Sequence, residues 1–384
     1  HQEALQLLHA AKQQAQRHED ARQRELLLLQ ARHDRTRTEL LKAQARLDET
    51  AAALERERQT LAETRLEARR EADVVLVVGS RLGETDWWGK PPYWGQPEDQ
   101  RMIQVDIDDE VLGLNKAAGL AILADATAFL SALSVELRQS PLNAKSLQAN
   151  RARTGALAED QVHIRAQLDV ALDNVARPMH SAHAPAACRR VFGDDAVYVF
   201  DGGNTAVWAN FFSEINGCDA LLSTFKFGML GAGVAQALGA QIAKPNAKVV
   251  CIIGDGAMGF HIQELESALR HQLPVIYVVL CDRQWGMVKM TQAVGLGAMR
   301  AAIGTEQQGT INADFEEIAF DDVARAMGCH GERVSHPDDL DAALGRCAAS
   351  GQPAVLHVDV DPQLHMFAPG LMEFKAMHQE PGAA

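Results

Sequence analysis

The chain has 384 residues, which is enough for two or three domains of about 100–200 residues each and for a sizeable hydrophobic core. Its 37 basic and 51 acidic residues give a formal net charge of −14, which argues against a protein that coats nucleic acid or an anionic membrane. Six cysteines occur without a CxxC pair, so neither a disulfide framework nor a zinc knuckle is indicated. No apolar run approaches the roughly 20 residues that span a bilayer, and no signal peptide is evident, so we expect a cytoplasmic protein.

The first part of the chain differs sharply in composition from the rest. Residues 1–73 contain no glycine, proline or aromatic residue, whereas all 29 glycines lie from Gly79 onward. Leucines recur at most seventh positions between Leu26 and Leu61, while the half-heptad positions between them are mostly polar or small. This pattern predicts a long helix with weak coiled-coil character over residues 1–72, and a single solvated helix is the alternative. The 14 basic and 14 acidic residues of this part balance, so it does not resemble a basic arm for DNA.

Short apolar runs after this point predict parallel strands. The run Val74–Val78, which is followed by Gly79, suits a strand buried on both faces of a sheet. The next predicted strands and helices are, in chain order, Met102–Ile107, Asp109–Leu114, Leu120–Leu123 and Thr127–Leu137. Together these elements predict half of an α/β domain over residues 73–138.

A linker and a second parallel sheet are predicted beyond this region. Residues 139–178 are polar and bounded by Pro141 and Pro178, which is typical of a linker, here with one amphipathic helix. The buried strands predicted after it are Ala196–Phe200, Val249–Ile253, Val275–Leu280 and Val355–Val360, with helical stretches such as Ile262–His271 between them. We therefore expect a doubly wound parallel sheet over residues 179–365, followed by a tail over residues 366–384.

The loop after one of these strands has the composition of a phosphate site. Gly254, Asp255 and Gly256 precede a helix, and glycines there let backbone N–H groups approach a phosphate at the positive end of the helix. The carboxylate of Asp255 would repel a bare phosphate, but a divalent cation bound between the carboxylate and the phosphate would remove this repulsion. Mg²⁺ suits that position because it prefers hard oxygen ligands. Asp282 follows the next strand, so the two carboxylates should emerge side by side at one edge of the sheet.

Four segments, taken in order, resemble the cofactor motif of the thiamin-diphosphate-dependent superfamily of acetolactate synthase, pyruvate oxidase and 2-oxo-acid decarboxylase. They are Asp201–Asn204 after a strand, Phe227–Gly233 opening a helix, Gly254–Gly256 with the later turn at Asp282, and Ile262–Leu265. The resemblance covers residues 179–365 as the cofactor-binding domain and residues 72–138 as part of a Rossmann-like central domain. It implies thiamin diphosphate and Mg²⁺ as cofactors.

The resemblance also implies roles for individual residues. Asp255 and Asp282 would bind Mg²⁺ together with the backbone carbonyl of Gln284. The carbonyl of Gly228 would accept a hydrogen bond from the aminopyrimidine, and Leu230 would prop the cofactor in a bent shape. The residues implied to line the diphosphate and pyrimidine through their backbone are Gly203, Asn204, Gly254, Gly256, Ala257 and Met258.

One departure from the family pattern lies at the metal site. Where the family usually has two asparagines, this chain has Cys281 and Asp282. The aspartate keeps an oxygen ligand but adds negative charge beside a diphosphate. We therefore expect metal binding to be retained with a shifted dependence on pH and on the choice of Mg²⁺ or Mn²⁺.

The resemblance implies an enzyme, a lyase or transferase similar to acetolactate synthase, that makes or breaks a C–C bond next to the carbonyl of a 2-oxo acid or acyl donor. The family's activating glutamate belongs to a separate pyrimidine-binding domain, and no segment of this chain matches that domain. The catalytic residue is therefore unassigned, and Glu25, Glu39 or Glu49 could be chosen only arbitrarily. We expect a homo-oligomer or a partner chain that supplies the domain, and no nucleic-acid or membrane partner. The rival hypothesis is a non-catalytic or partner-dependent assembly protein.

Overall fold

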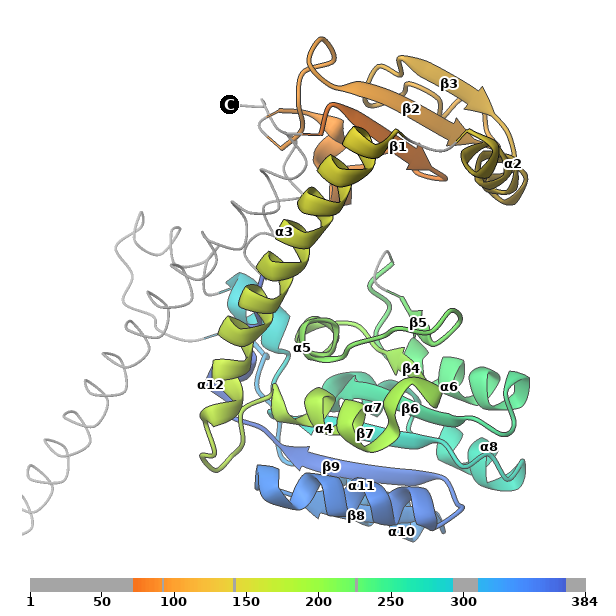
Figure 1. Ribbon diagram of the computed structural model, residues 1–384. Coiled ribbons are helices and arrows are strands. Elements are labelled where there is room, and N and C mark those ends of the chain that lie inside the picture. Colours follow the sequence, from red (N-terminus) through yellow and green to blue (C-terminus); the bar gives the residue numbers. More distant parts are fainter. Residues whose placement is uncertain (1–71, 92, 141–142, 225–226, 293–309, 371–384) are drawn as a thin grey trace, which may run out of the picture. The chain divides into compact units, whose positions relative to one another are not determined.

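The computed structural model describes residues 72–91, 93–140, 143–224, 227–292 and 310–370. The long helix expected over residues 1–72 and most of the expected tail lie outside the described residues. The described part contains two parallel sheets, one of three strands and one of six (Figure 1). Within that part, no helix combines the length and the apolar character needed to cross a membrane.

The smaller sheet has the strand order β1-β2-β3. Its elements are β1 (Val74–Val78), β2 (Arg101–Asp106), β3 (Leu120–Leu123) and the following helix α2 (Ala126–Gln139), with the short 3-10 helix η1 (Glu84–Gly89) between β1 and β2. The prediction of a helix over Asp109–Leu114 is wrong, because this stretch forms turns. Gly113 adopts a positive φ of 77°, which a right-handed helix excludes, and its N–H donates to the Gln104 side chain at 2.7 Å.

The expectation that β1 is buried on both faces is also wrong. Val77 is buried together with Leu82 and Trp94 of the loop that follows β1. On the opposite face, Val74 is 54% exposed and Leu76 is 41% exposed. Only the face that packs on the β1–β2 loop is therefore well covered in the part of the chain that the structure describes.

Helix α3 (Ala144–Asp169) occupies the expected linker and continues into the 3-10 turn η2 (Val170–Asp173). It is not the amphipathic helix that we expected, because Leu168 near its end is the one residue of α3 that is buried. Leu168 packs in a small apolar cluster with Trp208 and Phe212 of α5. The end of α3 is thus anchored to the larger sheet's helices, while most of its length is exposed.

The larger sheet has the strand order β5-β4-β6-β7-β9-β8, and all its strand pairs are parallel. Its strands are β4 (Ala196–Phe200), β5 (Leu221–Ser223), β6 (Lys248–Gly254), β7 (Ile276–Cys281), β8 (His330–Val334) and β9 (Ala354–Asp359). The four strands expected here match β4, β6, β7 and β9 to within one residue at each end. The two edge strands, β5 and β8, were not expected, because one is very short and the other is polar.

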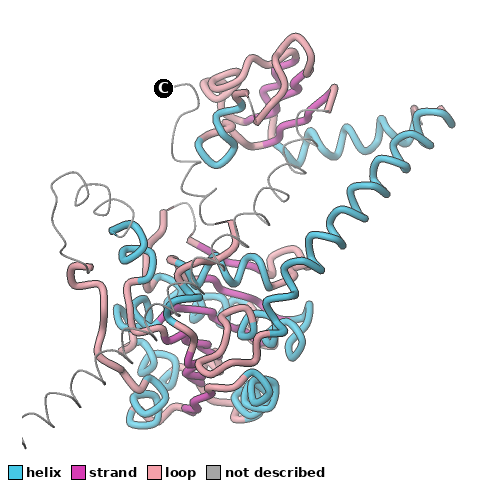
Figure 2. The backbone as a smooth tube through the Cα atoms, turned by 90° about the vertical axis from the view of Figure 1, so that its left-hand side faces the viewer, coloured by secondary structure: helices cyan, strands magenta, loops and turns pink. Residues whose placement is uncertain are grey.

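Helices cover both faces of this sheet, as Figure 2 shows from the side. One face packs on α4 (His183–Phe192), α5 (Asn204–Phe212) and α11 (Leu340–Ala349), and the other on α6 (Ala232–Ala243), α7 (Asp255–His261), α8 (Glu264–Arg270) and α10 (Phe320–Ala326). Short elements complete the region: η3 (Gly193–Asp195), η4 (Pro337–Asp339) and α12 (Pro362–His365). This is the doubly wound arrangement expected from the sequence. The winding reverses between the neighbouring strands β4 and β6, and ligands of such sheets bind at the carboxyl ends of the strands at that point.

Candidate functional site

The loops after β4 and β6 lie side by side at the point where the winding reverses. Strand β4 pairs with β6 from Ala196 to Phe200, so their carboxyl ends share one edge. Gly203 precedes α5 with a φ of +77°, a conformation that glycine adopts without steric cost. Asn204 begins α5 and is only 4% exposed. At the end of β6, a Cβ on Gly254 would stand 3.0 Å from the Thr205 hydroxyl, so the two loops touch.

Asp201 ties the β4 loop to the turn before α6. Its buried carboxylate accepts hydrogen bonds from the backbone N–H groups of Gly202 at 2.7 Å, Gly231 at 3.0 Å and Gly233 at 2.6 Å. Burial raises the pKa of Asp201, and these three N–H groups oppose the shift. The sequence interpretation used this residue only as part of a motif. Its signal was an aspartate at the end of a buried strand, directly ahead of two glycines.

The turn that carries Gly228 and Leu230 rests on the glycines of the β4 loop. The Gly228 N–H donates to the Thr224 carbonyl at 2.7 Å. The Leu230 side chain comes within 3.0 Å of the position that a Cβ would take on Gly202, and within 3.7 Å of that position on Gly203. Three predicted cofactor-contacting residues, Gly203, Gly228 and Leu230, are therefore brought together.

The two aspartates nominated as metal ligands emerge from adjacent strands. Gly254 of β6 lies opposite Leu280 of β7 in the register of the two strands. Asp255 follows Gly254 directly, and Asp282 lies two residues after Leu280. Asp255 accepts the N–H groups of Gly256 and Arg283, each at 2.7 Å. Both aspartates are buried, with exposed fractions of 7% for Asp255 and 4% for Asp282. Their side-by-side position agrees with the order of the strands in the sequence.

Burial and mutual repulsion make this pair unfavourable as two free carboxylates. Burial and, to a smaller extent, the charge of Asp282 raise the pKa of Asp255 to about 7. Burial also raises the pKa of Asp282, to about 6, against hydrogen bonds from Gln284. A cation shared by the two side chains would offset both effects. Mg²⁺ suits such a position because it binds one or two carboxylates together with phosphate oxygens.

A buried amide next to this pair lacks partners of its own. Among the residues that the structure describes, neither polar side-chain atom of Asn204 has a hydrogen-bond partner. Its Nδ2 lies 2.9 Å, and Asp282 Oδ2 lies 3.2 Å, from the point where a Cβ would stand on Gly286. Leaving a buried polar atom unsatisfied costs about 1–3 kcal/mol, so this amide suits an oxygen-rich ligand. The residues present therefore fit a diphosphate with its cation.

The remaining predicted residues offer backbone groups rather than side chains. Ala257 and Met258 point into the core under α7, which leaves only their backbone toward a ligand. The side chain of Gln284 is occupied, because its Nε2 donates to Asp282 at 3.0 Å and its Oε1 accepts from Lys289 at 2.9 Å. A Cβ on Gly256 would stand 2.6 Å from the Trp285 ring, so any larger residue at this position would force the ring to move.

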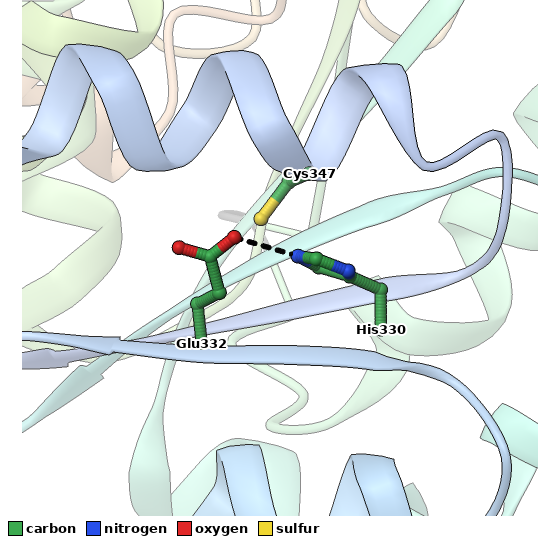
Figure 3. A group of neighbouring side chains, drawn as sticks. All are labelled: His330, Glu332 and Cys347. Carbon is green, nitrogen blue, oxygen red and sulfur yellow. Dashed lines mark hydrogen bonds and ion pairs between the residues drawn. The ribbon is translucent and has the colours of Figure 1, made fainter.

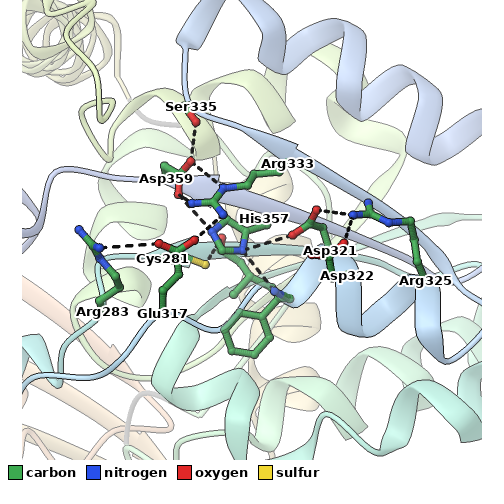
Figure 4. Close-up of polar contacts among 12 residues, drawn as sticks. Cys281, Arg283, Glu317, Asp321, Asp322, Arg325, Arg333, Ser335, His357 and Asp359 are labelled. Atoms are coloured by element: carbon green, nitrogen blue, oxygen red, sulfur yellow. Dashed lines mark hydrogen bonds and ion pairs between the residues drawn. The ribbon is translucent and has the colours of Figure 1, made fainter.

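A pocket of about 260 Å³ adjoins Asp255 and Gly256 at the same edge of the sheet. Its walls include Phe260, Trp285 and Phe315, and its polar side belongs to the network of Figure 4. The network residues that Figure 4 labels are Cys281, Arg283, Glu317, Asp321, Asp322, Arg325, Arg333, Ser335, His357 and Asp359. Of the predicted site residues, only Asp255 and Gly256 line this pocket. The sequence did not reveal it, because its wall residues come from separate segments without a motif.

The polar side of the pocket contains several ion pairs. Arg333 contacts Asp359 at 2.7 Å, and the His357 ring contacts the same carboxylate at 3.2 Å. Burial alone would raise the pKa of Asp359, but hydrogen bonds from His357, Arg333 and Ser335 hold it well below its usual range. Arg283 lies 3.7 Å from Glu317 in the same way. Asp359 and Glu317 are thus paired with arginines, whereas Asp255 and Asp282 lie beside each other and the charge of Asp282 disfavours a second charge on Asp255.

Two protein-family models match the chain. The C-terminal TPP-binding domain of thiamine pyrophosphate enzymes matches residues 201–358, and the central domain of the same enzymes matches residues 51–133. The first match contains Asp255, Asp282, the Asn204 loop and all of the pocket's lining residues except Asp359. The second contains the smaller sheet.

Curated relatives point in the same direction. A probable acetolactate synthase of Mycobacterium bovis is 30% identical over 311 residues, which cover 77% of this chain and 50% of that protein. A sulfoacetaldehyde acetyltransferase of Alcaligenes xylosoxydans xylosoxydans is 28% identical over 71% of this chain and 47% of its own length. A 2-hydroxyacyl-CoA lyase of Oryza sativa subsp. japonica is 28% identical over 76% of this chain and 49% of its own length. The chain spans about half the length of the curated relatives it matches.

Proposed function

We propose that this chain, which belongs to the thiamine pyrophosphate enzyme superfamily, binds thiamin diphosphate with Mg²⁺ at the carboxyl edge of its larger sheet. In this proposal it forms the cofactor-binding part of a lyase or transferase that makes or breaks a C–C bond next to the carbonyl of a 2-oxo acid. The observation that carries the proposal is the pair of buried, adjacent carboxylates beside the Asn204 amide, which has no hydrogen-bond partner among the described residues.

The chain's own residues would bind and orient the cofactor. Asp255, Asp282 and the Gln284 carbonyl would hold Mg²⁺, and Asn204 with the first N–H groups of α7 would hold diphosphate oxygens. The cofactor supplies stabilisation of a carbanion next to the substrate carbonyl. Asp201 would keep the β4 loop and the α6 turn in register, so that Leu230 stays against the bound group. Because the β4 loop and the α6 turn pack against each other, the cofactor-binding residues on them have little conformational freedom. They would therefore hold the cofactor in one orientation.

Activation of the pyrimidine is proposed to need a second component. By the resemblance it requires a glutamate from a pyrimidine-binding domain, which we did not identify in this sequence. We propose that a partner chain supplies that glutamate. A non-catalytic assembly protein is the competing reading, and it predicts no cofactor-dependent turnover under any combination of chains.

Calorimetric titration with thiamin diphosphate, with and without Mg²⁺, tests the binding proposal. We expect Mg²⁺-dependent binding of thiamin diphosphate by the wild-type chain and none by the Asp255→Ala variant, because Asp282 alone cannot hold the cation against the diphosphate. Asp341→Ala is the matched control, since Asp341 is an exposed acid that pairs with Arg190 on the opposite face. Equal binding by wild type and Asp255→Ala would contradict the proposal.

Turnover separates binding from catalysis. Decarboxylation of pyruvate by the purified chain, alone and with candidate partner chains, distinguishes an enzyme from an assembly protein. We expect no turnover in the absence of a chain that supplies the glutamate. Turnover by this chain alone would show that the glutamate lies within it.

A further inference from the structure

A second group of metal-binding side chains lies at the far edge of the larger sheet. His330 and Glu332 are two residues apart on the edge strand β8, so their side chains share one face. Cys347 lies on α11, which packs against β8. One ligand atom from each residue lies within 4.8 Å of the others (Figure 3). None of the three residues belongs to the proposed cofactor site or lines the pocket at Asp255.

The carboxylate of Glu332 lies between His330 and Arg346. Oε1 lies 2.8 Å from Nε2 of His330 and accepts from Nε of Arg346 at 3.1 Å, while Oε2 accepts from Nη2 and Nε of Arg346 at 2.6 Å and 3.0 Å. Figure 3 shows the Cys347 sulfur beside the oxygen that faces His330. A cation placed between sulfur, imidazole and Oε1 would replace the Arg346 contact to Oε1 and leave the two Arg346 contacts to Oε2 in place. Such an outer contact fixes the orientation of a ligating carboxylate.

The donor set decides which cation fits. Mg²⁺ and Ca²⁺ take oxygen ligands, whereas thiolate, imidazole and carboxylate together are a zinc set. We propose that His330, Glu332 and Cys347 form a three-ligand Zn²⁺ site, with a fourth position open to solvent, that ties the edge strand β8 to α11. On binding, the thiol proton of Cys347 is released to solvent and the sulfur ligates as thiolate.

Zinc binding would require only a small movement of the three side chains toward one another. Ligand atoms around tetrahedral zinc stand roughly 3.3–3.7 Å apart at the usual bond lengths, so the side chains would approach by about 1 Å. The approach is open, because the side chain of His330 is 27% exposed and that of Glu332 is 18% exposed. Burial and the nearby Glu332 charge together raise the pKa of the Cys347 thiol to about 12, which partly offsets metal binding. We therefore expect weaker binding than at a four-ligand structural site.

Cobalt substitution tests the site without relying on activity. Co²⁺ is titrated into the full chain in the presence of saturating Mg²⁺, which occupies the carboxylates at Asp255. We expect a thiolate-to-cobalt charge-transfer absorption at one equivalent, removed by Zn²⁺. The Cys347→Ser variant should lack the band, and His330→Gln should bind Co²⁺ at least about tenfold more weakly. Absence of any band in the wild-type chain would overturn the proposal.

Matched cysteine variants locate the sulfur. Cys281→Ser and Cys329→Ser, which change other buried cysteines, should keep the band. A band that survives Cys347→Ser but is lost in Cys281→Ser would overturn the proposal in favour of metal at Asp255. Cys347 is buried in the core, so its substitution can also disturb folding. Thermal unfolding of a variant at His330, whose side chain is 27% exposed, therefore provides a second measurement. Zn²⁺ should raise the Tm of the wild type and leave that of His330→Gln unchanged, and equal increases in both would contradict the site.

Discussion

The two parallel sheets are built from similar apolar strands but bury them differently. In the larger sheet, every residue of β4 and β7 is buried. In the smaller sheet, β3 leaves Leu120 52% exposed and Leu123 62% exposed. A parallel strand becomes fully buried only when helices cover both faces of its sheet. In the described part of the chain only the larger sheet meets this condition, and it is also the sheet whose loops hold the buried carboxylates.

The difference between the two sheets indicates which of them can hold ligand-binding side chains in fixed positions. Fully buried strands fix the starting points of their loops, so Asp201, Asp255 and Asp282 can each be held in a defined position. The loop after β1 has no comparable set of buried acids in the described residues. Changes at the edge of the larger sheet should therefore alter ligand binding and stability together, whereas changes in the smaller sheet should alter stability alone.

The largest expected effect is that of Asp201→Ala. Three backbone N–H groups would lose their buried acceptor, and each unsatisfied group costs about 1–3 kcal/mol. We expect the free energy of unfolding to fall by about 3 kcal/mol or more, and cofactor binding to be lost. Urea unfolding and calorimetry measure the two effects. Asp201→Asn should lie between, because an amide keeps one acceptor oxygen; unchanged stability in Asp201→Ala would refute this role.

The pH dependence of stability gives the next effect. Because the folded-state pKa values of Asp255 and Asp282 are raised to about 7 and about 6, the metal-free folded chain binds more protons than the unfolded chain above pH 4. Stability contributed by these groups is therefore lost as pH rises from about 4 to about 7, by at most about 1.4 kcal/mol per pH unit for each group. Mg²⁺ with thiamin diphosphate should remove this loss. Thermal unfolding measured from pH 4 to pH 8 checks this prediction.

Asp282→Asn serves as the control for that dependence. The amide keeps an oxygen ligand but removes one charge, so the slope between pH 4 and pH 7 should flatten while Mg²⁺-dependent binding survives. A slope that is identical in Asp282→Asn and the wild type would show that other groups cause it.

The sequence predicted the interior of the fold better than its edges. Strands β4, β6, β7 and β9 are continuous apolar runs, a pattern that identifies buried strands directly. The edge strand β8, His-Gly-Glu-Arg-Val, lacks that pattern because one side of it is not covered by another strand. Over Asp109–Leu114 the helical pattern competes with Gly113, whose positive φ and contact to Gln104 produce a turn. Both failures come from tertiary context that local sequence does not contain.

For the candidate site, the order of the strands along the chain predicted which loops lie together, but the sequence did not predict the orientation of the side chains. The adjacency of Asp255 and Asp282 follows from consecutive parallel strands, so it could be predicted. The role of Asp201 depends on Gly231 and Gly233 returning to it from thirty residues further on, which only the fold reveals. The pocket at Asp255 likewise combines Phe260, Trp285 and Phe315, which no periodic pattern connects.

Gly256→Ala should have a smaller effect at the same edge. The new Cβ would stand 2.6 Å from the Trp285 ring, which must move aside. Overpacking of this kind costs about 1–3 kcal/mol. We expect a shift in tryptophan fluorescence and weaker cofactor binding. Gly259→Ala is the matched control in the same helix, because no other group lies within 4 Å of its added Cβ; equal effects of the two substitutions would exclude the ring contact as the cause.

The smallest expected effect lies in the smaller sheet and tests the separation of the two regions. Asp125 accepts the Ala128 N–H at 2.9 Å at the start of α2, and loss of such a cap costs about 1 kcal/mol. We expect Asp125→Ala to lower helicity and stability slightly, as measured by circular dichroism during urea unfolding, while thiamin diphosphate binding stays unchanged. The cap is exposed. A marked loss of cofactor affinity in this variant would mean that the smaller sheet supports the binding edge, so that the contrast between the two sheets would no longer separate stability from binding.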